Sequence, residues 1–126
     1  MLAASAADRA AGEETTMDGI QLMTLAEDQL IRARDTQAGR AAHTVHGGHG
    51  HTLRQTVIAL AAGHELSEHN SPGEATLQVL IGRVRLTAGD ETWEGGPGGL
   101  VAIPPARHAL AALEDAAVLL TVLVGQ

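Results

Sequence analysis

GHELSEHNSPGEATLQVLIG, from Gly63 to Gly82, and GGLVAIPPARH, from Gly98 to His108, decide the fold of this chain. Each is a short run of apolar, β-type residues between glycines and prolines, and each carries a histidine near the end of a strand. Glycine permits tight turns and proline cannot donate to a sheet, so both residues divide β structure into short pieces. The two segments therefore predict short strands joined by tight turns.

The same β pattern extends over residues 41–126. In the first segment Glu65, Ser67 and His69 alternate onto one face. Further on, the apolar residues at every second position from Ala75 to Ile81 share one side of a strand. No helical pattern interrupts the series, which predicts an all-β sandwich or barrel. The predicted strands are 52–62, 64–69, 75–81, 84–86, 92–93, 100–103, 108–113 and 116–124.

Residues 20–34 have a helical period instead. Thr24 with Glu27 resembles a capping box, and Gly39 is a suitable stop signal, so we predict a helix within 19–38. This helix is expected to cover the open end or the outer wall of the barrel, or alternatively to dock on a partner. The apolar face consists of Leu22, Leu25, Ala26, Gln29 and Leu30.

The composition limits both the core and the partners. The chain has 126 residues, which predicts one domain, and its single aromatic residue, Trp93, leaves a core of Ala, Val, Leu and Ile. A net charge of −7 argues against binding to nucleic acid or to an anionic membrane. Without cysteine there is no disulfide framework and no thiol chemistry.

Nothing in the sequence predicts a membrane or secreted protein. Residues 1–18 are alanine-rich and polar, without the basic-then-apolar order of a secretory signal, and are expected to form a flexible tail. No apolar run approaches the ~20 residues of a membrane-spanning helix. A cytoplasmic location is the expectation.

The two deciding segments resemble the paired motifs of the cupin family of small β-barrels. In the first motif, five residues separate Gly63 from His69, and Gly82 closes the motif at the expected distance. In the second motif, five residues separate Gly98 from Pro104, and His108 follows. The resemblance implies a jelly-roll barrel (a double-stranded β-helix) at 41–126, with a central pocket and frequently a homodimeric assembly.

The resemblance also implies a metal site, and here the chain departs from the family pattern. Two of the four usual ligand positions hold histidines, His69 and His108, while the other two hold Ser71 and Ala75. The closing asparagine position of the second motif holds Ala112. Zinc, iron, manganese or nickel ordinarily needs at least three protein ligands, so the site is expected to be degenerate.

Other residues offer alternative ligands. Glu74 can supply a third ligand if the Pro72-Gly73 turn bulges inward. His49 and His51, in a histidine-rich and glycine-rich stretch at 43–51, can do so if that loop covers the barrel mouth. The simpler interpretation of this stretch is a solvated turn between two strands.

Three functions remain open. The favoured one is a cupin that binds a small molecule without catalysis, in a pocket formed by His69, Ser71, Leu77, Val79 and His108. The second is a metal-dependent enzyme, similar to a dioxygenase or an isomerase, that uses the two histidines and a non-standard third ligand. The third is an interaction module that dimerises and presents its helix. Enzyme status stays open, with the missing ligands favouring a non-enzyme.

Overall fold

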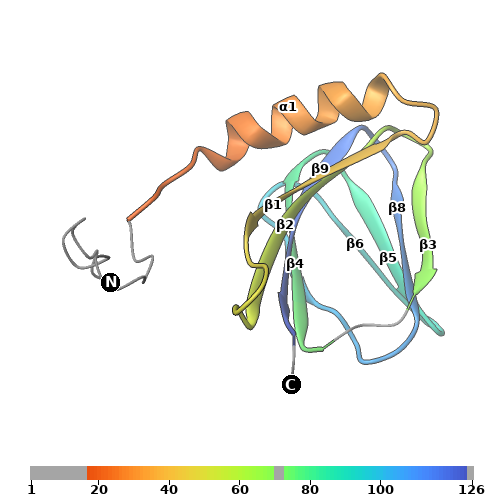
Figure 1. Cartoon of the computed structure of the whole chain (residues 1–126). Helices are drawn as coiled ribbons and strands as arrows, with labels where there is room; N and C mark the ends of the chain where they lie inside the picture. Colours follow the sequence, from red (N-terminus) through yellow and green to blue (C-terminus); the bar gives the residue numbers. More distant parts are fainter. Residues whose placement is uncertain (1–16, 70–72, 125–126) are drawn as a thin grey trace.

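The fold consists of one helix and nine strands within residues 17–69 and 73–124, the part of the chain that the computed structural model describes (Figure 1). The strands form two antiparallel sheets, ordered β1-β2-β9-β4-β7 and β3-β8-β5-β6. This confirms the predicted all-β jelly-roll barrel with a short N-terminal helix. The elements are α1 (Leu22–Arg34), β1 (Arg40–His46), β2 (Leu53–Leu60), β3 (Glu65–His69), β4 (Ala75–Ile81), β5 (Val84–Ala88), β6 (Glu91–Gly95), β7 (Leu100–Ala102), β8 (His108–Ala112) and β9 (Ala116–Leu123).

The main core lies between the two sheets. Alternate residues of β4 and β9 point into it, because successive side chains of a strand face opposite sides. Aliphatic residues of the four-stranded sheet meet them, and Trp93 packs at the margin. The buried members are Leu60, Ala75, Leu77, Val79, Val84, Leu86, Ile103, Leu110, Ala112, Ala116, Val118 and Val122.

A second core lies on the other face of the five-stranded sheet, where α1 covers it (Figure 1). Ala26, Leu30 and Ala33 are buried on the helix side, and the sheet supplies Val57, Ala59, Leu80, Ala117 and Leu119. The small alanines let the helix approach the sheet closely, so the layer closes without aromatic residues. Of the two predicted positions on the barrel, the helix takes the outer wall.

The helix is shorter than predicted at both ends. Its N-cap is Gln21, which makes no side-chain capping hydrogen bond, and Thr24 lies inside the first turns, so the expected capping box is wrong. The helix ends at Arg34, and the chain turns through a glycine with positive φ, Gly39 at 67°. Packing against the sheet thus decides where this helix starts, and the local capping signal at Thr24 does not.

Register shifts in β4 and β3 change which of their residues share a face. In β4 the register with β9 shifts between Val79 and Ile81, so Ile81 packs with the helix layer and not with Val79. In β3 the register with β8 shifts between Leu66 and His69. Strict alternation was the prediction for both segments, and it is wrong at these two points, because a bulge inserts one residue without a partner.

Gly39 and His64 lie against each other where the helix layer meets the start of β3. A Cβ atom on Gly39 would overlap the His64 imidazole ring. The backbone of His64 is fixed on both sides: its N–H donates to the Ala61 carbonyl at 3.0 Å, and its carbonyl accepts from Ala112 at 2.9 Å. The ring therefore has little room to yield.

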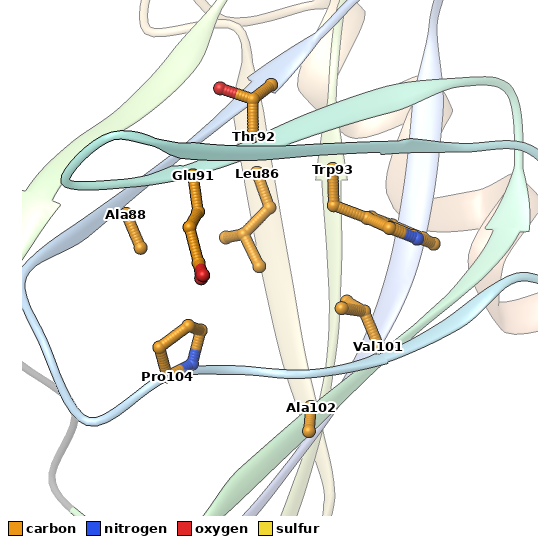
Figure 2. A pocket seen from close by; sticks show the side chains of 8 residues that line it. All are labelled: Leu86, Ala88, Glu91, Thr92, Trp93, Val101, Ala102 and Pro104. Atoms are coloured by element: carbon orange, nitrogen blue, oxygen red, sulfur yellow. The ribbon is translucent and has the colours of Figure 1, made fainter.

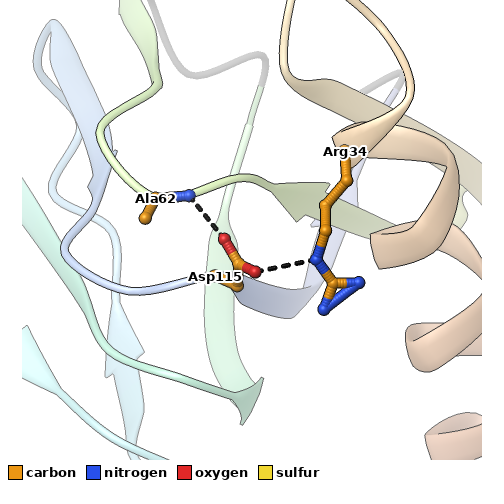
Figure 3. A network of polar contacts seen from close by, with 3 residues as sticks. All are labelled: Arg34, Ala62 and Asp115. Carbon is orange, nitrogen blue, oxygen red and sulfur yellow. Dashed lines mark hydrogen bonds and ion pairs between the residues drawn. The ribbon is translucent and has the colours of Figure 1, made fainter.

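Asp115 joins three segments of the chain at the same end of the barrel (Figure 3). One of its carboxylate oxygens accepts from the Ala62 backbone N–H at 2.8 Å, and the other accepts from Arg34 Nε at 2.8 Å. These two hydrogen bonds, the Ala62 bond foremost, lower the pKa of Asp115 below its ordinary value of 3.8. The last turn of α1 is thereby tied to two turns of the barrel.

None of the helical segments that the structure describes is long and apolar enough to cross a membrane.

Gly39→Ala is expected to destabilise the protein by about 2 kcal/mol or more, because the methyl group adds a steric overlap to the cost of a positive φ. Gly89→Ala is the matched control, since Gly89 has a φ of 60° but nothing within 4 Å of an added Cβ. Urea unfolding of both variants measures the difference. Equal losses of unfolding free energy in Gly39→Ala and Gly89→Ala would show that the His64 ring moves aside.

Asp115→Asn is expected to cost up to about 1 kcal/mol at neutral pH, the scale of an exposed charge pair. A carboxyl whose pKa is lowered by folding stabilises above its unfolded pKa, and this stabilisation is lost as the pH falls through the folded pKa. The variant and the wild type should therefore converge in urea unfolding as the pH falls below the ordinary carboxyl pKa of 3.8. Asp90→Asn, in the exposed turn before β6, should show no such convergence.

Candidate functional site

Four residues lie in one row of register across the four-stranded sheet. His69 of β3 pairs in register with His108 of β8, His108 pairs with Ala88 of β5, and Ala88 pairs with Glu91 of β6. Because neighbouring strands lie about 4.8 Å apart, the backbones of His108 and Glu91 are separated by about 10 Å. The bulge in β3 is what aligns His69 with His108, and the small side chain of Ala88 leaves space in the middle of the row.

His108 is a buried histidine with a defined ring orientation. It is 5% exposed and lies on the same face of β8 as Leu110 of the main core. Its Nδ1 lies 3.0 Å from the backbone carbonyl of Ala106. A carbonyl oxygen can only accept, so Nδ1 donates and the neutral ring carries its lone pair on Nε2.

The other predicted pocket residues have different surroundings. Leu77 and Val79 are 3% and 0% exposed and pack within the main core. Ser71 lies outside the described residues. For His69 the structure gives the backbone pairing with His108. A shared pocket of these five residues therefore stays a prediction.

The alternative metal ligands lie in two exposed loops. Glu74 is exposed in the bend before β4, and His49 and His51 are exposed in the turn between β1 and β2, where a turn was predicted. The His51 ring stacks on that of His46, with 5.0 Å between the ring centres.

Among the side chains that the structure describes, which are those of residues 17–67 and 73–124, no three from His, Asp or Glu lie together as metal ligands. A transition metal held by protein ordinarily needs three. His69, one of the two predicted ligands, lies outside this set.

A cavity of about 350 Å³ opens at the seam where the edge strands of the two sheets face each other (Figure 2). The β5–β6 hairpin forms one wall and β7 with the segment after it forms the other. Leu86, Trp93 and Val101 point into the space between the walls, and Pro104 closes the lower side in this view. The lining residues are Leu86, Ala88, Glu91, Thr92, Trp93, Val101, Ala102 and Pro104.

Trp93 is held in place by two glycines. A Cβ atom on Gly95 would overlap the indole ring, and one on Gly99 would lie 3.2 Å from it. Gly99 is itself fixed to β4, because its carbonyl accepts from the Val79 N–H at 2.9 Å. Opposite Trp93 in register stands Leu86, which supports the ring from β5. The position of the Trp93 ring in the cavity wall is therefore fixed in the absence of a ligand.

Glu91 supplies the charge of the cavity. Its side chain points from β6 toward Pro104 across the opening (Figure 2). Within the described part of the chain the Glu91 carboxylate makes no hydrogen bond and no ion pair. Glu94, on the other face of the same strand, differs: it binds Arg85 at 2.9 Å and lies 3.9 Å from Arg83.

Glu91 was not among the site residues predicted from the sequence. The available signal was its position two residues before Trp93 in a strand, which places both side chains on one face. What the sequence does not show is that β6 ends its sheet opposite β7, which turns that face into a cavity wall.

No family model matches this sequence, and no curated protein matches it. Solved structures do match. A conserved protein of unknown function from Streptococcus pyogenes is 30% identical, with a TM-score of 0.64, over 72% of this chain and 79% of that protein. A cupin superfamily protein from Desulfitobacterium hafniense is 19% identical, with a TM-score of 0.62, over 68% and 77%.

A DMSP lyase from Ruegeria pomeroyi is also similar in structure. It is 22% identical, with a TM-score of 0.61, and the alignment covers 68% of this chain but 47% of the lyase. At 19% and 22% identity these likenesses establish a shared fold, and a fold by itself does not specify a reaction.

Gly95→Ala is expected to displace the indole of Trp93, which shifts its fluorescence to longer wavelength and destabilises the protein by about 1–3 kcal/mol. The signal is unambiguous because the chain has one Trp and neither Tyr nor Phe. Gly96→Ala is the control, since its added Cβ would meet the end of the Arg83 side chain at 3.3 Å. An unchanged emission spectrum in Gly95→Ala would contradict the fixed position of the ring.

Proposed function

Because this chain shares the fold of cupin superfamily proteins, we propose that it binds a small molecule between its two sheets and does not catalyse a reaction. The cavity at the β6–β7 seam is the observation that carries the proposal. It has the size of a small-ligand site, its lining is only slightly more apolar than polar, and a single carboxylate provides a charged contact. Its inner lining reaches Ala88, the register partner of His108.

The chemistry of the row supports binding over catalysis. General acid–base work needs a histidine with a proton acceptor or donor aligned to it and to the substrate. His108 has its Nδ1 directed to a backbone carbonyl, which fixes the ring orientation. The cavity therefore has the groups to hold a molecule in one orientation.

The second candidate function is a metal-dependent enzyme. Its support is the register pairing of His69 with His108, together with the likeness in fold to a DMSP lyase. A backbone carbonyl that holds one ring nitrogen, as Ala106 holds that of His108, also occurs behind metal-binding histidines. The two candidates differ in whether the purified protein retains an ion.

Binding in the cavity is tested with 2-phenylethanol, a small neutral probe with an apolar ring. We expect it to change the fluorescence of Trp93 with saturation in the millimolar range, as for a fragment-sized ligand. Val101→Phe fills the cavity and should abolish the change. Leu100→Phe is the matched control, because Leu100 is the neighbouring β7 residue and is 64% exposed. If Val101→Phe, still folded, binds like the wild type, the probe does not occupy this cavity.

Metal content is tested by elemental analysis of protein purified without a histidine tag. We expect Zn, Fe, Mn and Ni well below one ion per chain, since two histidines alone bind such ions weakly. One ion per chain that disappears in both His69→Ala and His108→Ala would instead establish the metal-dependent enzyme as the better proposal.

A further inference from the structure

We infer that the cavity at the β6–β7 seam selects a small organic ammonium ion with an apolar body. The inference rests on the proposed binding function and adds the charge class of the ligand. It follows from the juxtaposition of the Glu91 carboxylate, the Trp93 indole and an apolar wall in one opening (Figure 2).

The first step concerns the carboxylate. Glu91 points into the opening, and no cation among the described residues neutralises it. The two arginines near the hairpin pair with a different carboxylate, because Arg85 and Arg83 bind Glu94. A charged group at the rim of an apolar cavity favours a ligand that brings the opposite charge.

The second step concerns the aromatic wall. The face of an indole attracts cations through its quadrupole, and tryptophan is the strongest of the side chains in this respect. Trp93 and Glu91 lie on the same face of β6, so one ammonium group can contact both. Leu86, Val101 and Pro104 are left to cover the apolar remainder of the ligand.

The third step excludes the other charge classes. An anion would approach Glu91 without a compensating cation in the lining, and the whole chain adds a net charge of −7. A neutral ligand gains the apolar contacts alone. Because Glu91 is exposed to solvent, water screens its charge, and the advantage of a cation is expected to be modest, about tenfold.

The experiment compares three probes of nearly equal shape: 2-phenylethylammonium, 2-phenylethanol and 3-phenylpropionate. Trp93 fluorescence and amide shifts of β6 and β7 in NMR give each Kd. We expect the ammonium ion to bind about tenfold more tightly than the alcohol and the carboxylate to bind most weakly. Added salt should reduce the preference for the ammonium ion and leave the alcohol unchanged.

Two variants locate the charge effect. Glu91→Gln should remove most of the preference for the ammonium ion, leaving the contribution of the Trp93 face, while the Kd of the alcohol stays the same. Glu94→Gln removes an equal charge from the opposite face of the same strand and should keep the preference. A loss of preference in Glu94→Gln as large as in Glu91→Gln would overturn the assignment of the charge effect to the cavity.

The outcomes separate this inference from the proposed function. If all three probes bind equally in the wild type and in Glu91→Gln, the cavity binds small molecules but has no charge selectivity, and the inference fails alone. If none of the probes changes the Trp93 signal or the amide shifts, the binding function fails as well.

Discussion

The five-stranded sheet is apolar on both faces, and the remainder of the molecule follows from the need to cover both. β9 is the clearest case, since its residues alternate between the core shared with the four-stranded sheet and the core shared with α1. A sheet buried on both sides must be matched by two layers. With no phenylalanine or tyrosine in the chain, these layers close through small aliphatic side chains, so they must approach closely and fit well.

The sequence was sufficient to predict the barrel because its signals are local. Glycine and proline separate the strands, and apolar residues at every second position, as in Ala75–Val79, mark the buried face. The helix was predicted as an element, yet Thr24 misplaced its start, because the contacts of Ala26, Leu30 and Ala33 with the sheet outweigh a capping signal. The homodimer, the cytoplasmic location and the tail at 1–18 stay predictions.

The site was less accessible to sequence analysis because it depends on register and on sheet edges. His69 and His108 were selected from their motifs, and their pairing requires a bulge that alternation alone does not reveal. Glu91 and Trp93 become cavity residues only because β6 and β7 end their respective sheets on the same side of the barrel. Whether a strand lies at the edge of its sheet depends on the order of all the strands, and the residues of one strand do not reveal that order.

The two glycines beneath Trp93 have a consequence for how relatives of this protein can diverge. The room available to a ligand depends on how closely the indole can approach Gly95, the last residue of β6, and Gly99, the residue before β7. The electrostatic preference depends on residue 91, at the opposite end of β6. Changes at one end of this strand can therefore resize the chamber while its charge stays the same, and changes at the other end can do the reverse.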